Sequence, residues 1–396
     1  MINKKLLVKV GLNVINIKPK KEINIIIRYN KNSIKEYRLR NHINYYFAVD
    51  CKNSTINIDI ERVYGQIANE ENEILEELSA FHYGFAQTRN GITYNISYSF
   101  DSNYYMGAFA SIYSLIKNFD ETKLKLLYLY LFIPEEDFES ADINIKNFIN
   151  ITNNYNTNKI NYTVIFVSKE LVNDEFKMTK CYKGGNHLLK LSNFSRLIVC
   201  NFINSKNLLY LDSDTIIQSD MSSILDIVPE KNNFAFIGKK AELTFNNLIN
   251  NVNTKHLLDF LGKDFDLNKN VIYTGTMILN TNVIKNNFNK MIELVKKHND
   301  VEGGIYKLFT MSIINLGMVG NIGYFDSYLK NIADLGFKEN LEEQIENSDV
   351  LDWSGMYKPW FRNGLYKEYW MKYNIMFGKL EKYVMYNKDT VETNLS

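Results

Sequence analysis

The pattern of apolar and polar residues changes near residue 90, which predicts two regions of different architecture. In the first region, residues 56–60 alternate strictly between apolar and polar side chains, as a half-buried strand does. β-Branched and aromatic runs predict further strands at 6–10, 23–29 and 45–49. Residues 70–80 have a helical pattern and are expected to connect the two regions. We therefore expect residues 1–90 to form a small β-rich N-terminal domain of unknown role.

From residue 91 onward, predicted strands alternate with predicted helices. Strands are expected at 94–100, 124–133, 160–167, 208–212, 234–238, 271–280 and 318–324. Helices are expected at 104–118, between 133 and 160, and around 188–202. Such alternation is typical of an α/β fold with a parallel-rich sheet covered on both faces. We expect one domain over residues 91–330 and a C-terminal segment over residues 331–396.

Composition and charge exclude several classes of function. The chain has 396 residues, of which 45% are hydrophobic and 23% charged, as in a globular protein with a large core. Its net charge of +1 gives no electrostatic support for binding nucleic acid. No apolar run is long enough to span a bilayer, and no signal-peptide core follows the N-terminus, so a cytoplasmic protein is expected. The three cysteines are widely spaced, which argues against a disulfide framework or a zinc cluster.

Two carboxylates follow the apolar run at 208–211, and they are the first candidates for chemistry. Asp212 and Asp214 stand where this strand ends, and ligands of open α/β sheets bind beyond the carboxyl ends of the strands. Carboxylate oxygens suit Mn²⁺ or Mg²⁺, which can in turn hold substrate phosphates. Asp264 and Asp266 have the same spacing but follow a Gly-Lys pair, so a loop is expected there. The alternative for Asp212 and Asp214 is a pair of solvated carboxylates at a turn.

Three other segments make this interpretation more specific. They are Asp101-Ser102-Asn103-Tyr104 after a predicted strand, Ser195-Arg196-Leu197 on a predicted helix, and Gly355-Met356-Tyr357-Lys358-Pro359-Trp360 near the C-terminus. Together with the Asp212 segment, they resemble the retaining glycosyltransferases of family 8 over about residues 91–375. The resemblance implies a GT-A fold, in which a Rossmann-like mixed sheet flanked by helices binds a nucleotide sugar. It also implies a C-terminal segment that completes the donor site.

The resemblance implies a role for individual residues. Asp101, Asn103 and Tyr104 would bind the uridine of a UDP-sugar, although Asp101 could equally be a helix N-cap. Arg196 would lie near the donor sugar and diphosphate; otherwise it would be an ordinary surface arginine. The remaining residues would hold the diphosphate and its metal ion, namely Asp212, Ser213, Asp214, Gly355 and Lys358. The other interpretation of the Gly355 segment is a turn anchored by tryptophan, with an exposed lysine.

The sequence departs from the family pattern at the metal and at the sugar. Asp352 stands where the family has a metal-binding histidine, so Asp212, Asp214 and Asp352 would share the ion. Tyr273 replaces an asparagine that contacts the sugar, and Thr310 and Ser312 replace two acids beside the anomeric carbon. Phe100 replaces a small residue near the base. The residues expected to bind the donor nucleotide and diphosphate therefore match the family pattern, whereas the residues expected to face the sugar differ from it.

Two functions follow from this pattern. The first is a metal-dependent retaining transferase, with Asp214, Arg196 and Lys358 as catalytic residues, which moves a hexose from a UDP-sugar to a lipooligosaccharide, capsule or glycoprotein glycan. The second is a nucleotide-sugar-binding protein with little transfer activity that acts as a partner or scaffold. Aromatic and basic residues interleave along 358–382, which favours peripheral contact with the inner face of the membrane. The same aromatic residues would also suit packing on the α/β domain.

Overall fold

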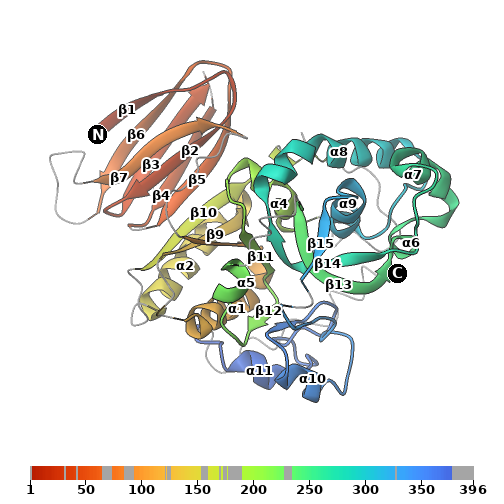
Figure 1. Ribbon diagram of the computed structural model, residues 1–396. Helices are drawn as coiled ribbons and strands as arrows, with labels where there is room; N and C mark the ends of the chain where they lie inside the picture. Colours follow the sequence, from red (N-terminus) through yellow and green to blue (C-terminus); the bar gives the residue numbers. More distant parts are fainter. Residues whose placement is uncertain are drawn as a thin grey trace.

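The structure is a computed structural model that describes most of the chain (Figure 1). It describes residues 2–30, 33–41, 43–64, 74–83, 93–120, 122, 126–152, 159–168, 171–172, 176, 190–226, 234–325 and 328–376. Within these ranges, no helix is both long enough and apolar enough to cross a membrane.

The described part of the N-terminal region is made of strands, as its alternating, β-branched and aromatic runs predict. Four of them form an antiparallel sheet in the order β1 (Ile2–Leu7), β6 (Thr55–Val63), β3 (Ile23–Asn30) and β4 (Ser33–Leu39). Three more strands are β2 (Gly11–Pro19), β5 (Asn44–Cys51) and β7 (Leu75–His82). The helix predicted at 70–80 is therefore wrong over residues 75–80, while residues 70–73 lie outside the described part. Pairing of β7 with β2 supplies tertiary hydrogen bonds that override the local helical preference of a Leu- and Glu-rich segment.

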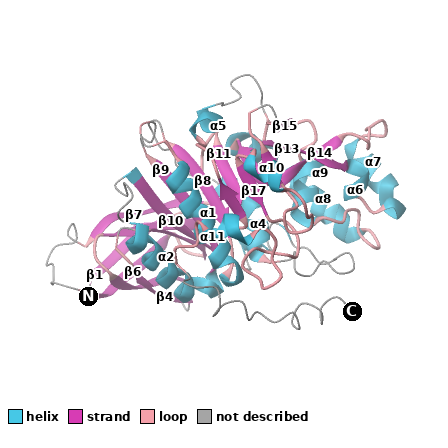
Figure 2. Cartoon of the chain, turned by 90° about the horizontal axis from the view of Figure 1, so that it is seen from below, coloured by secondary structure: helices cyan, strands magenta, loops and turns pink. Residues whose placement is uncertain are grey.

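Within the described ranges, the main sheet has ten strands and crosses the boundary between the two regions. Its order is β15-β13-β14-β11-β8-β9-β10-β5-β2-β7. The strands not yet named are β8 (Tyr94–Ser99), β9 (Leu127–Pro134), β10 (Ile160–Val167), β11 (Leu208–Asp212), β13 (Phe236–Thr244), β14 (Asn270–Leu279) and β15 (Ile322–Tyr324). Strand β5 pairs in parallel with β10, so part of the N-terminal region extends the sheet that carries the site (Figures 1 and 2).

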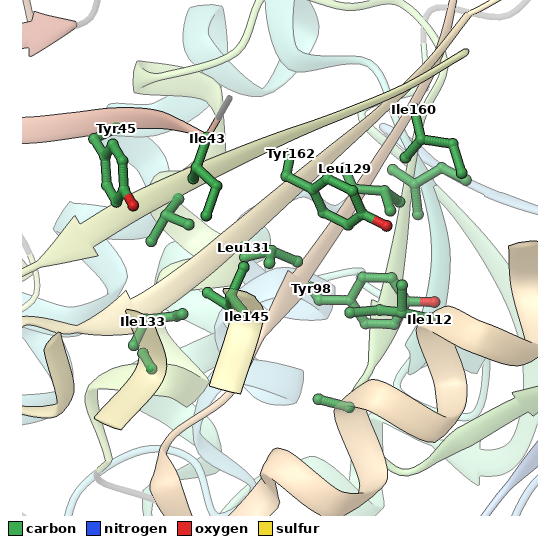
Figure 3. Packing of buried hydrophobic residues seen from close by; sticks show 14 of the residues in the cluster. Ile43, Tyr45, Tyr98, Ile112, Leu129, Leu131, Ile133, Ile145, Ile160 and Tyr162 are labelled. Carbon is green, nitrogen blue, oxygen red and sulfur yellow. The ribbon is translucent and has the colours of Figure 1, made fainter. Parts of the chain in front are cut away.

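Helices cover both faces of this sheet, which confirms the predicted α/β class. On one face, α1 (Tyr105–Asn118) and α2 (Phe138–Thr152) pack on apolar residues such as Leu129 and Leu131, seen in Figure 3. On the other face, α4 (Leu191–Ile198), α8 (Thr281–Asp300) and α9 (Phe309–Gly317) pack on Tyr130 and Phe132. Successive residues of β9 thus enter opposite cores, because side chains alternate across a strand.

Shorter helices complete the periphery and the C-terminal segment. They are α5 (Ser222–Asp226), α6 (Phe245–Leu248), α7 (Thr254–Leu261), α10 (Glu342–Glu346) and α11 (Lys367–Met371). The expected helix at 188–202 is shorter than predicted: α4 is followed by a 3₁₀ turn at Val199–Asn201. Asp264 and Asp266 lie in a loop after α7, as predicted.

The described part of the C-terminal segment, residues 331–376, folds back onto the α/β core through a small third sheet. In this sheet, β12 (Thr215–Ile217) pairs with β17 (Val350–Asp352), which pairs with β16 (Asn331–Ile332). Trp360 and Trp370 are only 3% and 1% exposed and belong to a cluster with Ala110 and Ile216. This arrangement supports packing for these aromatic residues. The basic residues beyond 376 lie outside the described part of the chain.

An ionic cluster connects the N-terminal strands to helix α2. The Arg40 guanidinium lies 2.7 Å from Glu22 and 2.6 Å from Asp142, and the Tyr45 hydroxyl donates to Asp142 at 2.8 Å. Burial by itself would raise the pKa of Glu22, but hydrogen bonds from Arg40 and two other cations outweigh it and lower this pKa to about 2. Burial raises the pKa of Asp142, and the bond from Arg40 offsets only part of that rise.

Replacing Arg40 with Met is expected to lower the free energy of unfolding at pH 7 by about 3 kcal/mol, because it leaves two shielded carboxylates without their main partner. The carboxylate of Glu22, with a folded pKa below its ordinary value of 4.5, stabilises the fold above that pH and loses this contribution as the pH falls towards 2. The difference in unfolding free energy between variant and wild type should therefore shrink as the pH falls over this range. Urea unfolding of both proteins at several pH values measures this difference.

Arg38 offers a matched control for this experiment. It also pairs with Glu22, but its side chain is 49% exposed, compared with 12% for Arg40. Arg38→Met should change the unfolding free energy by less than about 1 kcal/mol, as for exposed ion pairs. Equal effects of the two substitutions would show that the cluster does not join the two regions energetically.

Candidate active site

The first two carboxylates lie at the carboxyl end of β11, in the centre of the main sheet. Residues Leu208–Leu211 are buried and form the strand, and a tight turn to β12 follows, closed by a 2.8 Å bond from the Thr215 hydroxyl to the Asp212 carbonyl. The side chain of Asp214 is 10% exposed and that of Asp212 is 22% exposed. They are therefore not the two solvated carboxylates of the alternative interpretation.

Arg196 holds Asp212 in place from helix α4. Its guanidinium lies 2.8 Å from Asp212 Oδ1 and donates to the Thr274 carbonyl at 3.2 Å, and the Tyr210 hydroxyl donates to the same Oδ1 at 2.8 Å. Burial lowers the pKa of Arg196, but the charge of Asp212 and the smaller effects of its other neighbours together outweigh burial and raise this pKa. Burial raises the pKa of Asp212, against the opposing effect of Arg196. Arg196 is thus a buried cation of the site and not an ordinary surface arginine.

Lys358 reaches the same place from the C-terminal segment. Its ammonium group pairs with Asp214 Oδ2 and donates to the Trp353 carbonyl at 2.6 Å. Burial lowers the pKa of Lys358, but the charge and hydrogen bond of Asp214, together with Tyr104 and Asp352, outweigh burial and raise this pKa, so the group remains an ammonium. The exposed lysine of the alternative interpretation is therefore wrong. Pairing between Lys358 and Asp214 is a contact that the sequence did not predict.

Asp352 enters the site on strand β17, opposite Thr215 of β12. Its Oδ1 accepts hydrogen bonds from the Tyr273 hydroxyl at 3.0 Å and from the Ser354 amide at 2.8 Å. Its Oδ2 is buried and has no hydrogen-bond partner. Burial, and then the charges of Asp214 and Asp212, raise the pKa of Asp352 well above its ordinary value. Two carboxylates from the turn after β11 and one from β17 therefore lie close enough to repel one another.

Gly275 leaves room between two of these carboxylates. A Cβ atom at this position would collide with Asp352 Oδ2 and lie 3.2 Å from Asp212 Oδ2. No group of three or more His, Cys, Asp or Glu side chains within the described ranges has the arrangement of a formed metal site. The donor set nevertheless fits a hard divalent cation, because it is made of carboxylate oxygens and one of them is buried without a partner.

The Asp101 segment forms the other end of the candidate site. Asp101 caps a 3₁₀ turn (Ser102–Tyr104) by accepting from the Asn103 amide at 2.9 Å, so the N-cap role is observed. Its Oδ2 lies 3.1 Å from the Lys190 ammonium, a contact that the sequence did not predict. The Tyr104 ring has the ammonium groups of both Lys190 and Lys358 at 5.7 Å from its centroid. The side chain of Asn103 is exposed. This end therefore offers an aromatic ring and exposed polar groups beside two cations.

Glycine and serine positions shape the two loops of the site. Gly355 has a φ of +111°, and a Cβ there would lie 2.5 Å from the Phe337 ring, so only glycine fits. Ser213 is buried in the turn between the carboxylates, and its carbonyl lies against Gly107 of α1, where a Cβ would collide with it. Gly355 and Ser213 thus have structural roles in their loops in addition to the expected contact with a diphosphate.

The replaced sugar-facing residues take up structural roles. Ser312 is fully buried; its hydroxyl accepts from the Leu308 amide at 3.1 Å and donates to the Leu248 carbonyl at 3.4 Å. Thr310 is buried on the same helix, α9. Tyr273 contacts Asp352 and therefore belongs to the carboxylate cluster as well as to the predicted sugar side. The bond from Tyr273 to Asp352 joins two positions at which the sequence departs from the family pattern.

Comparison with known proteins agrees with this geometry. The model of the family described as glycosyl transferase family 8 matches residues 95–364. The chain belongs to glycosyltransferase family 8. The match covers the Asp101 segment, both carboxylates of the Asp212 turn, Asp352 and Lys358. Among curated proteins, none matches the chain at a significant level.

Solved structures show the fold of this family 8 member to be GT-A. The bifunctional glycosyltransferase WbbM, in its apo form, is 16% identical with a TM-score of 0.54; the match covers 76% of this chain and 54% of that one. The chain thus spans about half the length of WbbM. The galactosyltransferase LgtC, in complex with donor and acceptor sugar analogues, is 15% identical with a TM-score of 0.50, and the match covers 71% of this chain and 95% of that one.

Proposed function

We propose that this family 8 glycosyltransferase transfers a hexose from a UDP-sugar to a glycan acceptor, with retention at the anomeric carbon and with Mn²⁺ or Mg²⁺ as cofactor. One observation carries the proposal. Asp212 and Asp214 from one turn meet Asp352 from a distant strand at the end of the sheet, beside two buried cations, while Asp352 Oδ2 stays without a hydrogen-bond partner. Arg196 and Lys358 balance two of the three negative charges, and burying the remaining one is unfavourable unless a ligand compensates it.

Asp212, Asp214 and Asp352 would hold the cation in this proposal. The ion would neutralise the negative charge that develops on the departing diphosphate and would act as a template for it. Lys358 and Arg196 provide two further positive charges fixed by buried contacts, and such preorganised charge is usually the largest catalytic term. Asp101, Asn103 and Tyr104 would bind the uridine, with Lys190 at hydrogen-bond distance from Asp101.

Retention in this protein would use no nucleophile from helix α9. Thr310 and Ser312 carry no carboxylate, and the Ser312 hydroxyl is committed to two backbone groups. A front-face reaction meets this condition, because an oxygen of the departing phosphate takes the proton of the acceptor hydroxyl on the same face of the sugar. The chain's own contribution would then be to hold the diphosphate, the metal and the acceptor in place.

The second candidate function is binding of a nucleotide sugar with little transfer. The structural use of Ser312 favours it, because that position no longer offers a group to the sugar. The carboxylates and cations of the donor end remain in this case too. The two candidates therefore differ in turnover and not in nucleotide binding.

A UDP-release assay separates the two candidates. Purified protein would be incubated with UDP-glucose, UDP-galactose and the two N-acetylhexosamine donors, each with Mn²⁺, with Mg²⁺ or with EDTA, and with and without glycan acceptors. We expect release of UDP that EDTA abolishes and Mn²⁺ restores. Because Tyr273 is larger than the asparagine it replaces, we expect UDP-galactose or an N-acetylhexosamine donor to be at least as good as UDP-glucose. Tight binding of UDP in calorimetry without release from any donor would favour the binding protein.

A further inference from the structure

A hydrogen bond from Tyr273 joins the two parts of the site that depart from the family pattern, the expected sugar side and the expected metal side. It lies on β14, and its hydroxyl donates to Asp352 Oδ1 at 3.0 Å, across 79 residues of sequence. Its ring also lies close to Gly275, since the Tyr273 Cε1 atom is 2.7 Å from the place of a Gly275 Cβ. The side chain therefore passes beside the gap between Asp352 and Asp212.

The hydrogen bonds on Asp352 are unevenly distributed between its two oxygens. Oδ1 accepts from both the Tyr273 hydroxyl and the Ser354 amide, whereas Oδ2 is buried and accepts from no group. Two donors on one oxygen restrict rotation of the carboxylate group. Oδ2 is thus held toward Gly275, on the side where Asp212 Oδ2 also lies.

The backbone on both sides of Tyr273 is fixed by hydrogen bonds with side chains. The Asn315 side chain accepts from the Ile272 amide at 2.8 Å and donates to the Ile272 carbonyl at 3.0 Å. Arg196 donates to the Thr274 carbonyl at 3.2 Å. Both neighbours of Tyr273 are therefore fixed by buried polar side chains, which gives the tyrosine a rigid base.

We propose that Tyr273 is the positioning residue of Asp352: it fixes Oδ1 so that Oδ2 is presented to a divalent cation shared with Asp212. This inference rests on the proposed metal dependence. A hydrogen bond from a neighbouring side chain orients a metal ligand, and its loss typically weakens metal binding by about 10- to 100-fold. Tyr273 would thereby serve the metal end of the site, although its sequence position corresponds to the sugar side.

Metal affinity, measured apart from turnover, tests this role. Binding of Mn²⁺ would be measured by electron paramagnetic resonance in the presence of UDP, for the wild-type protein and for Tyr273→Phe. We expect Mn²⁺ to bind at least about 10-fold more weakly to the variant.

Tyr98→Phe is the matched control. Tyr98 is fully buried, and its hydroxyl accepts a hydrogen bond from Ser111 and makes no hydrogen bond to the three carboxylates. The Tyr98→Phe substitution should leave the Mn²⁺ affinity unchanged. A second test uses the Asp352→Ala background, in which Tyr273→Phe should cause no further loss of affinity because its partner is gone. Tyr273→Gln gives an independent variant if the phenylalanine protein is poorly folded.

The outcomes distinguish the two levels of the argument. Absence of Mn²⁺ binding to wild-type protein at any UDP concentration would overturn the proposed metal dependence and, with it, this inference. Mn²⁺ binding to wild type with the same affinity in Tyr273→Phe would overturn the positioning role alone. An equal loss in the Asp352→Ala background would also overturn it, because the effect would not pass through Asp352.

Discussion

Replacement of Asp214 with Asn is expected to lower UDP release by at least about 10³-fold while the protein still folds. The substitution keeps the shape of the side chain but removes the charge that pairs with Lys358 and that would hold the metal ion. It also leaves the buried Lys358 ammonium without its ion-pair partner. The free energy of unfolding should therefore fall by about 3 kcal/mol, as expected when one member of a buried ion pair is removed.

Asp264→Asn is the control for this experiment. It belongs to the other Asp-x-Asp segment, in a loop, and is exposed. This variant should retain wild-type turnover and stability. Steady-state UDP release, far-ultraviolet circular dichroism and urea unfolding of the three proteins test the prediction. Wild-type turnover of Asp214→Asn would remove Asp214 from the reaction.

Replacement of Lys358 with Met is expected to change metal binding and turnover in opposite directions. In the structure, the Lys358 ammonium occupies Asp214 Oδ2, so it competes with a cation for that carboxylate. Without this competitor, Mn²⁺ should bind the nucleotide-free protein more tightly, by about 10-fold for a gain of 1.4 kcal/mol. Turnover should nevertheless fall by about 10²–10³-fold, because a preorganised positive charge near the diphosphate is lost.

Lys338→Met supplies the comparison for Lys358. Lys338 lies in the same C-terminal segment and pairs with Asp334, but its side chain is 50% exposed. It should change neither Mn²⁺ affinity nor UDP release. Weaker Mn²⁺ binding by Lys358→Met would contradict the competition, and unchanged turnover would show that the lysine does not act on the donor.

The local pattern of apolar and polar residues was sufficient to predict most strands of the α/β region and one part of the site, the turn that carries Asp212 and Asp214. The apolar run of β11 places Asp212 and Asp214 at the end of a strand, because strand period and strand ends are local properties that a buried segment carries in its own residues. Strand β10 was predicted with its observed bounds, and the loop around Asp264 was separated from the Asp212 turn for the same reason. Family membership and the GT-A fold were also predicted from short motifs and are confirmed.

Contacts between distant segments were decided only by the tertiary structure. Strand β7 was mistaken for a helix because its partner β2 lies about 60 residues away in the sequence and its pairing outweighs local preference. The pairing of β5 with β10 could not be predicted from the residue pattern of either strand. Likewise, the sequence offered Lys358 and Tyr273 as separate candidates for diphosphate and sugar. Their pairing with Asp214 and Asp352 follows from the packing of β12 against β17, since hydrogen bonds between side chains depend on distances that no local spacing encodes.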